Sequence, residues 1–145
     1  MTIEISRRAL MATAASVGAI AASGCTGAAT PSDALGDRDA TGVAAAVRDG
    51  EITAAEALEA AIARSESVNG QLNFIAAPLY EYGRARAAGT LTGPFAGVPT
   101  LIKDLMAMTG QPTRFGARAF ANFVPDAQPP YMDALLAAGL VPFGK

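Results

Sequence analysis

The sequence has 145 residues, enough for one small domain, and a net charge of −2 from 11 basic and 13 acidic residues. Hydrophobic residues make up 51% and charged residues 17%, so a core can form, and no basic stripe favours nucleic-acid binding. With no histidine and one cysteine, this chain alone cannot build a Ser-His-Asp or Cys-His catalyst, a histidine-ligated metal site or an internal disulfide. No nucleotide-binding glycine motif occurs, so we expect no cofactor, and acid–base chemistry falls to Lys, Asp, Glu or Tyr.

Residues 1–25 are typical of an export signal. An Arg7-Arg8 pair precedes an uncharged run over residues 9–22, which is too short to span a bilayer as a helix. Residues 6–11 resemble a twin-arginine signal, and the run ends in Ala-Ser-Gly-Cys25, which resembles a bacterial lipoprotein cleavage box with alanine in place of the usual leucine. We expect an exported protein, periplasmic or in the cell envelope, with a lipid anchor on Cys25. The alternative is a simple signal that is cut at a nearby small residue.

Residues 26–38 are predicted to be a flexible tether, and residues 39–145 a folded domain. The spacing of apolar residues over 43–47 predicts a helix that stops at Gly50 and is capped by Asp39 or Thr41. The pattern Thr53-Ala-Ala-Glu56 is a capping box, which predicts a second helix ending near Ser67.

Further along, the pattern alternates between strands and helices. Residues 72–76 are a strand candidate, and Pro78 and Gly89 fit the N1 and C′ positions of a helix between them. Residues 98–103 are predicted to be a strand, 130–139 a helix and 140–143 a further strand. Strand, helix, strand predicts a right-handed βαβ crossover, and hence an α/β fold with helices packed on a parallel or mixed sheet.

Lys103 ends an apolar run within residues 93–105, so the sequence carries an ammonium to the edge of a core. Desolvation disfavours the charged form of lysine, and a neutral amine is a base or a nucleophile. The segment therefore predicts a site. The alternative is a surface lysine at the end of a strand, which the pattern alone favours.

Several segments resemble landmarks of the amidase signature family, and they occur in the family's order. Gly-Pro-Phe-Ala-Gly-Val-Pro-Thr-Leu-Ile-Lys-Asp over residues 93–104 resembles the family's lysine segment. The same resemblance holds for residues 49–56, 69–73, 109–120, 123–126 and 137–145, and it covers roughly residues 39–145. Chance does not readily produce such an ordered set.

The resemblance implies an amide hydrolase of the Ser–cis-Ser–Lys type, acting on a small-molecule amide, on an α/β fold with a central mixed sheet. It implies that Lys103 is the triad lysine, which acts through the middle serine and needs no metal. Asp104 points to the opposite face of an extended strand, so we expect it to be a structural hydrogen-bonding residue. A Schiff-base lysine enzyme would use Lys103 differently.

The family's two serines lie in a glycine- and serine-rich segment that this sequence does not contain. Outside the export segment its serines are Ser32, Ser65 and Ser67, and none has the glycine context of an oxyanion loop. We therefore expect a truncated, N-terminal portion of an amidase that is inactive alone. The alternative is a noncatalytic exported lipoprotein module derived from an amidase. Leu105, where asparagine is common, resembles members that act on aminohexanoate-type amides.

Overall fold

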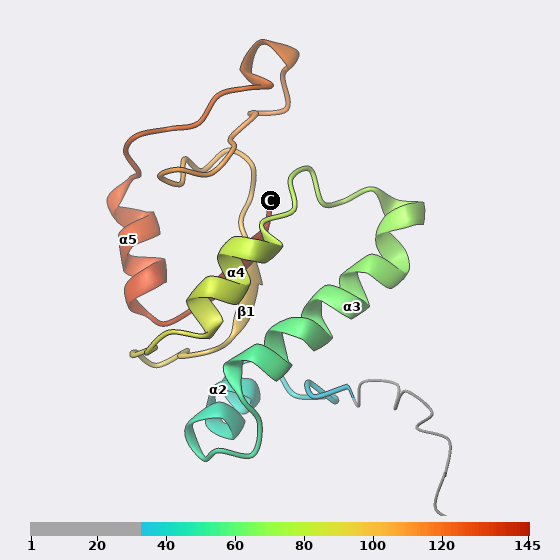
Figure 1. Cartoon of the computed structure of the whole chain (residues 1–145), viewed down its shortest axis with the longest axis vertical. Helices are drawn as coiled ribbons and strands as arrows, with labels where there is room; N and C mark the ends of the chain where they lie inside the picture. The colour runs from blue at the N-terminus through green and yellow to red at the C-terminus, as the bar shows by residue number, and fades with distance from the viewer. Residues whose placement is uncertain (1–32) are drawn as a thin grey trace, which may run out of the picture. The chain divides into compact units, whose positions relative to one another are not determined.

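The computed structural model describes residues 33–145, and the predicted export segment with Cys25 lies outside this range. The described part contains four α-helices, one 3-10 helix and two short strands (Figure 1). In chain order these are α2 (Ala40–Arg48), α3 (Ala54–Leu72), α4 (Tyr80–Ala87), β1 (Pro99–Leu101), η1 (Arg118–Phe120), α5 (Pro130–Ala137) and β2 (Val141–Gly144). None of the helices in residues 33–145 is both long and apolar enough to cross a membrane.

Local capping signals set the starts of the first two helices, as predicted. Asp39 is the N-cap of α2, where its carboxylate accepts a hydrogen bond from the Gly42 N–H at 2.7 Å. Thr53 and Glu56 form the predicted capping box at the start of α3, each satisfying a backbone N–H of the other. Such caps satisfy donors that have no partner within the helix.

The end of α3 and the next predicted strand are corrections. The helix continues past Ser67 to Leu72, and Asn73 ends it in the left-handed conformation, with φ 48°. The predicted strand at residues 72–76 does not form. Instead the backbone N–H groups of Ala76 and Ala77 donate to the Lys145 carbonyl oxygen, and Leu79 N–H donates to Phe143 O. This pairing with the end of β2 delays the next helix, so α4 starts at Tyr80 and Pro78 is not its N1 residue.

The two strands pair in parallel and are joined through α5, which confirms the predicted strand–helix–strand unit. Pro99 pairs with Val141 and Thr100 with Pro142, and a register shift then places Leu101 opposite Gly144. β1 is shorter than the predicted strand over 98–103, although Ile102 N–H still donates to Gly144 O at 2.9 Å. α5 begins at Pro130, as expected of a proline in the first helical turn.

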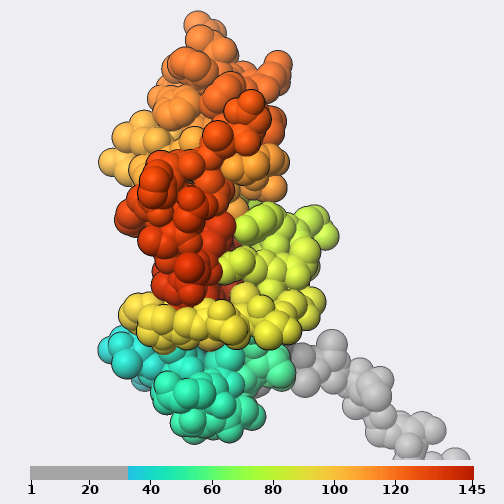
Figure 2. All heavy atoms as spheres, turned by 90° about the vertical axis from the view of Figure 1, so that its left-hand side faces the viewer, coloured from blue at the N-terminus to red at the C-terminus, as the bar shows by residue number. Residues whose placement is uncertain are grey.

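The core forms where the helices meet the sheet. α4 packs on β2, and this close approach leaves little room for a side chain at Gly83, since a Cβ there would lie 3.1 Å from the Pro142 carbonyl oxygen. One buried cluster joins α3 to β2 through Leu58, Ala61, Ile62, Val141 and Phe143. A second cluster joins the residues around α5 to the end of β1: Leu79, Ile102, Met108 and Met132. Figure 2 shows α5 on one face of the domain, between the segment over residues 105–128 and the segment over residues 90–98.

Residues 33–38, which the sequence places in the tether, contact α3. The Arg64 guanidinium donates to the Asp33 carboxylate and to the Gly36 carbonyl oxygen. The hydrogen bond from Arg64 lowers the pKa of Asp33, and Leu35 packs against the cluster that contains Leu58. Within the described residues, the segment over 33–38 is therefore packed on α3.

Candidate active site

Lys103 lies immediately beyond β1, at the first turn that follows the sheet. The Ile102 N–H before it donates to Gly144 O at 2.9 Å, and the Lys103 carbonyl oxygen accepts from the Met106 N–H at 3.0 Å. The Lys103 side chain is exposed among the described residues. The alternation of the strand explains the exposure, because Ile102 points into the core and its two neighbours point away from it.

A surface hollow of about 390 Å³ lies beside Lys103. Its other walls are mostly apolar, and they come from β1, the following turn and α5: Thr100, Leu101, Ile102, Met106, Tyr131 and Leu135. Met106 lines this hollow, whereas Met108 is fully buried in the core. The hollow therefore places one amine beside apolar walls, an arrangement suited to an apolar acyl group held next to a base.

Asp104 takes part in a network of hydrogen bonds and one ion pair that does not include the Lys103 side chain. Both carboxylate oxygens accept from the Arg114 backbone N–H, at 3.1 and 3.2 Å, and the Arg114 guanidinium donates to Ala76 O at 3.0 Å. The prediction that Asp104 is a structural hydrogen-bonding residue is confirmed. Its charged partner is Lys145, whose Nζ lies 3.4 Å from Asp104 Oδ1.

Lys145 is the buried lysine of the chain, and sequence reasoning missed it. Its ammonium donates to Met106 O at 2.8 Å, Pro112 O at 3.1 Å and Thr113 Oγ1 at 2.6 Å. Burial lowers the pKa of Lys145, and the nearby Asp104 carboxylate opposes that shift. The signal was in the sequence: Lys145 ends the apolar strand at 140–143, just as Lys103 ends the apolar run at 98–102.

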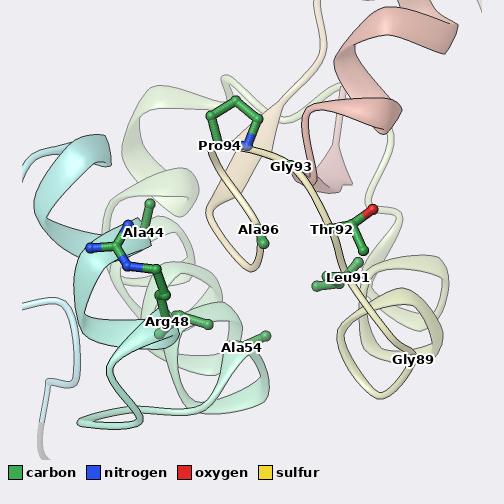
Figure 3. A pocket seen from close by; sticks show the side chains of 10 residues that line it. Ala44, Arg48, Ala54, Gly89, Leu91, Thr92, Gly93, Pro94 and Ala96 are labelled. Atoms are coloured by element: carbon green, nitrogen blue, oxygen red, sulfur yellow. The ribbon is translucent and has the colours of Figure 1, made fainter.

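A second hollow, of about 410 Å³, lies between α2 and the loop over residues 89–96 (Figure 3). Among the described residues, Arg48 is the only charged one that lines it, and its guanidinium also pairs with Asp49 at 3.4 Å. The lining residues that the structure describes include no carboxylate and no amine, the groups that usually carry acid–base chemistry. Over residues 33–145 no cluster of three or more His, Cys, Asp or Glu side chains is placed to hold a metal ion.

The helices packed on two parallel strands make this an α/β protein, and comparison with known proteins shows its family. A family model described as Amidase matches residues 56–145. The chain belongs to the amidase signature family. AmiC of Mycobacterium leprae, which is named as an amidase, is 42% identical over 115 residues, covering 78% of this chain and 24% of AmiC.

A further relative and a solved structure are both named for the hydrolysis of 6-aminohexanoate cyclic dimers. The 6-aminohexanoate-cyclic-dimer hydrolase of a Pseudomonas species is 38% identical over 111 residues, covering 74% of this chain and 22% of that protein. A solved structure of 6-aminohexanoate cyclic dimer hydrolase complexed with substrate has a TM-score of 0.70 at 36% identity, covering 74% of this chain and 23% of that one. The chain thus spans about a quarter of the length of the relatives it matches.

Proposed function

We propose that this chain contributes the lysine of a Ser–cis-Ser–Lys triad to an amide hydrolase, and that Lys103 is that lysine. The observation that carries the proposal is the place of Lys103: it follows β1 by two residues within the family-matched region, and its side chain lines the apolar hollow. Lys145 does not suit this role, since its side chain is fully buried and no substrate can reach it.

In the proposed reaction, the Lys103 amine acts as a base. Through the middle serine, the Lys103 amine takes the proton of the nucleophilic serine, whose oxygen attacks the amide carbonyl carbon. The C–N bond then breaks and the proton passes to the departing amine, which leaves an ester on the serine. Water hydrolyses that ester and restores the serine. Both serines belong to a segment that these 145 residues do not contain, so we propose that the chain alone does not hydrolyse amides.

The apolar hollow supports a substrate class. Leu101, Met106 and Leu135 wall the space beside the amine, so we propose an amide whose acyl part is aliphatic. Two relatives named for the hydrolysis of 6-aminohexanoate cyclic dimers are 38% identical to this chain, and Leu105 is in line with that class. Linear and cyclic aminohexanoate amides are therefore the first substrates to test.

The test measures amine release from these amides by the complete product of the gene that encodes this chain. We expect Lys103→Met to abolish hydrolysis and Lys103→Arg not to restore it, because arginine keeps its proton. A Lys103→Met protein that retains its rate would refute the role of Lys103. The 145-residue chain assayed alone should be inactive, and Lys103-dependent hydrolysis by that chain would contradict the need for a second segment.

We also propose that residues 1–25 direct export and that Cys25, outside the described residues, carries a lipid. The Arg7-Arg8 pair, the uncharged run and the small residues before Cys25 support this proposal. Labelled palmitate supplied to expressing cells should enter the protein and be lost in Cys25→Ser. Equal labelling of both proteins would contradict a lipid on Cys25.

A further inference from the structure

The buried Lys145 ammonium contacts four groups that all lie on one segment, residues 104–113. It donates three hydrogen bonds to this segment, to Met106 O, Pro112 O and Thr113 Oγ1, and pairs with the Asp104 carboxylate. An ammonium has three N–H donors, and these three hydrogen bonds use all of them. Lys145 has no role in the proposed reaction, so the presence of a lysine at this buried position needs another explanation.

These contacts hold the turn that begins at Lys103. The turn is closed by the hydrogen bond from Met106 N–H to Lys103 O, and Lys145 binds it at Asp104 and at Met106 O. On the other side of Lys103, the Ile102 N–H donates to Gly144 O, the residue before Lys145. Gly144 and Lys145 therefore fix the chain immediately before and immediately after Lys103.

We propose that Lys145 and Asp104 are positioning residues that fix the backbone of Lys103, and so set the point from which its amine enters the apolar hollow. This inference rests on the proposed function, in which Lys103 is the catalytic amine. The fully buried Lys145 side chain acts through the turn, and it does not meet the substrate. A small displacement of a catalytic group can lower the reaction rate by a large factor, so residues that fix the backbone of Lys103 would help to maintain the rate.

The first test is hydrogen exchange on the full 145-residue chain, followed by mass spectrometry of peptides from residues 103–114 and from α3. We expect Lys145→Met and Asp104→Asn to speed exchange over 103–114 by about tenfold or more, with α3 unchanged. Lys103→Met is the matched control and should exchange like the unsubstituted chain. Exchange over 103–114 within twofold of the unsubstituted chain in Asp104→Asn would overturn the inference. Loss of protection in α3 in both variants would also overturn it, since the pair would then support the whole fold.

The second test measures amide hydrolysis by the complete gene product. Asp104→Asn keeps the shape of the side chain, and we expect it to lower kcat about tenfold while KM stays within twofold. An unchanged kcat beside an inactive Lys103→Met protein would overturn the positioning role alone and leave the proposed function intact. A Lys103→Met protein that stays active would refute the proposed function and the positioning role with it, while faster exchange would remain a property of the turn.

Discussion

The two lysines of this chain provide a matched pair for a stability measurement. Lys145→Met and Lys103→Met remove the same charge and insert the same unbranched side chain. At Lys145 the change deletes three hydrogen bonds and leaves Asp104, whose side chain is 13% exposed, without its charged partner. Breaking a buried pair from one side costs about 3–5 kcal/mol, and the partial exposure of Asp104 places the expected cost near 3 kcal/mol. At the exposed Lys103 the cost should stay within about 0.5 kcal/mol.

Urea unfolding of the full chain measures this difference. For a small protein with an m-value of about 1–3 kcal/mol/M, a loss near 3 kcal/mol lowers the midpoint by about 1–3 M. The Lys103→Met midpoint should stay within about 0.5 M of the unsubstituted chain, since its cost is small. Coincident midpoints for the two variants would refute the reasoning, because they would show that the contacts of Lys145 add no net stability.

Three further outcomes are expected. Acetylation by an amine-specific ester should modify the exposed Lys103 well before Lys145, as read by peptide mass, and equal rates would contradict their difference in burial. Burial lowers the pKa of Lys145 below 10.5, so between its folded pKa and 10.5 the unfolded chain binds more protons. The unfolding free energy of the unsubstituted chain relative to Lys145→Met should therefore rise with pH in that window. A fall with pH would contradict a lowered pKa of Lys145 in the folded chain. Gly50 and Gly139 both have positive φ, but a Cβ meets no atom within 4 Å at Gly50 and lies 2.5 Å from Thr92 O at Gly139. Gly50→Ala should cost about 1–2 kcal/mol and Gly139→Ala about 1–3 kcal/mol more in thermal unfolding, and equal costs would show that the crowding is relieved.

Features with a local cause could be predicted from the sequence. Asp39, Thr53 and Glu56 cap their helices through hydrogen bonds that span three residues, and Pro129-Pro130 starts α5 by fixing φ. The parallel pairing of the two strands agrees with the helix between them, because parallel strands need a long crossover connection, which is usually a helix.

Features decided by distant partners could not be predicted. Residues 72–76 look like a strand, but the backbone donors of Ala76 and Ala77 meet Lys145 O, nearly seventy residues along the chain. The helix expected to end near Ser67 continues through Gly70 to Leu72, and Asn73 then ends it in the left-handed conformation. A glycine inside a helix costs only about 1 kcal/mol, so it does not end a helix by itself.

Under the proposed function, burial alone is a poor guide to the catalytic lysine. Lys103 and Lys145 each follow an apolar strand, and what packs over the end of that strand decides which is buried: residues 104–113 cover Lys145, whereas no described residue covers Lys103. Desolvation favours the neutral form of Lys145. A neutral amine, however, has one N–H fewer than an ammonium, and its lone pair would face an acceptor oxygen. Lys145 would then lose one of its three hydrogen bonds, and no substrate can reach it. Over residues 33–145 the Lys103 amine has no hydrogen-bond partner, and it lines the hollow, so a reacting group can approach it. Accessibility together with an anchored backbone therefore supports the proposal that Lys103 is the base and that the buried Lys145 positions it.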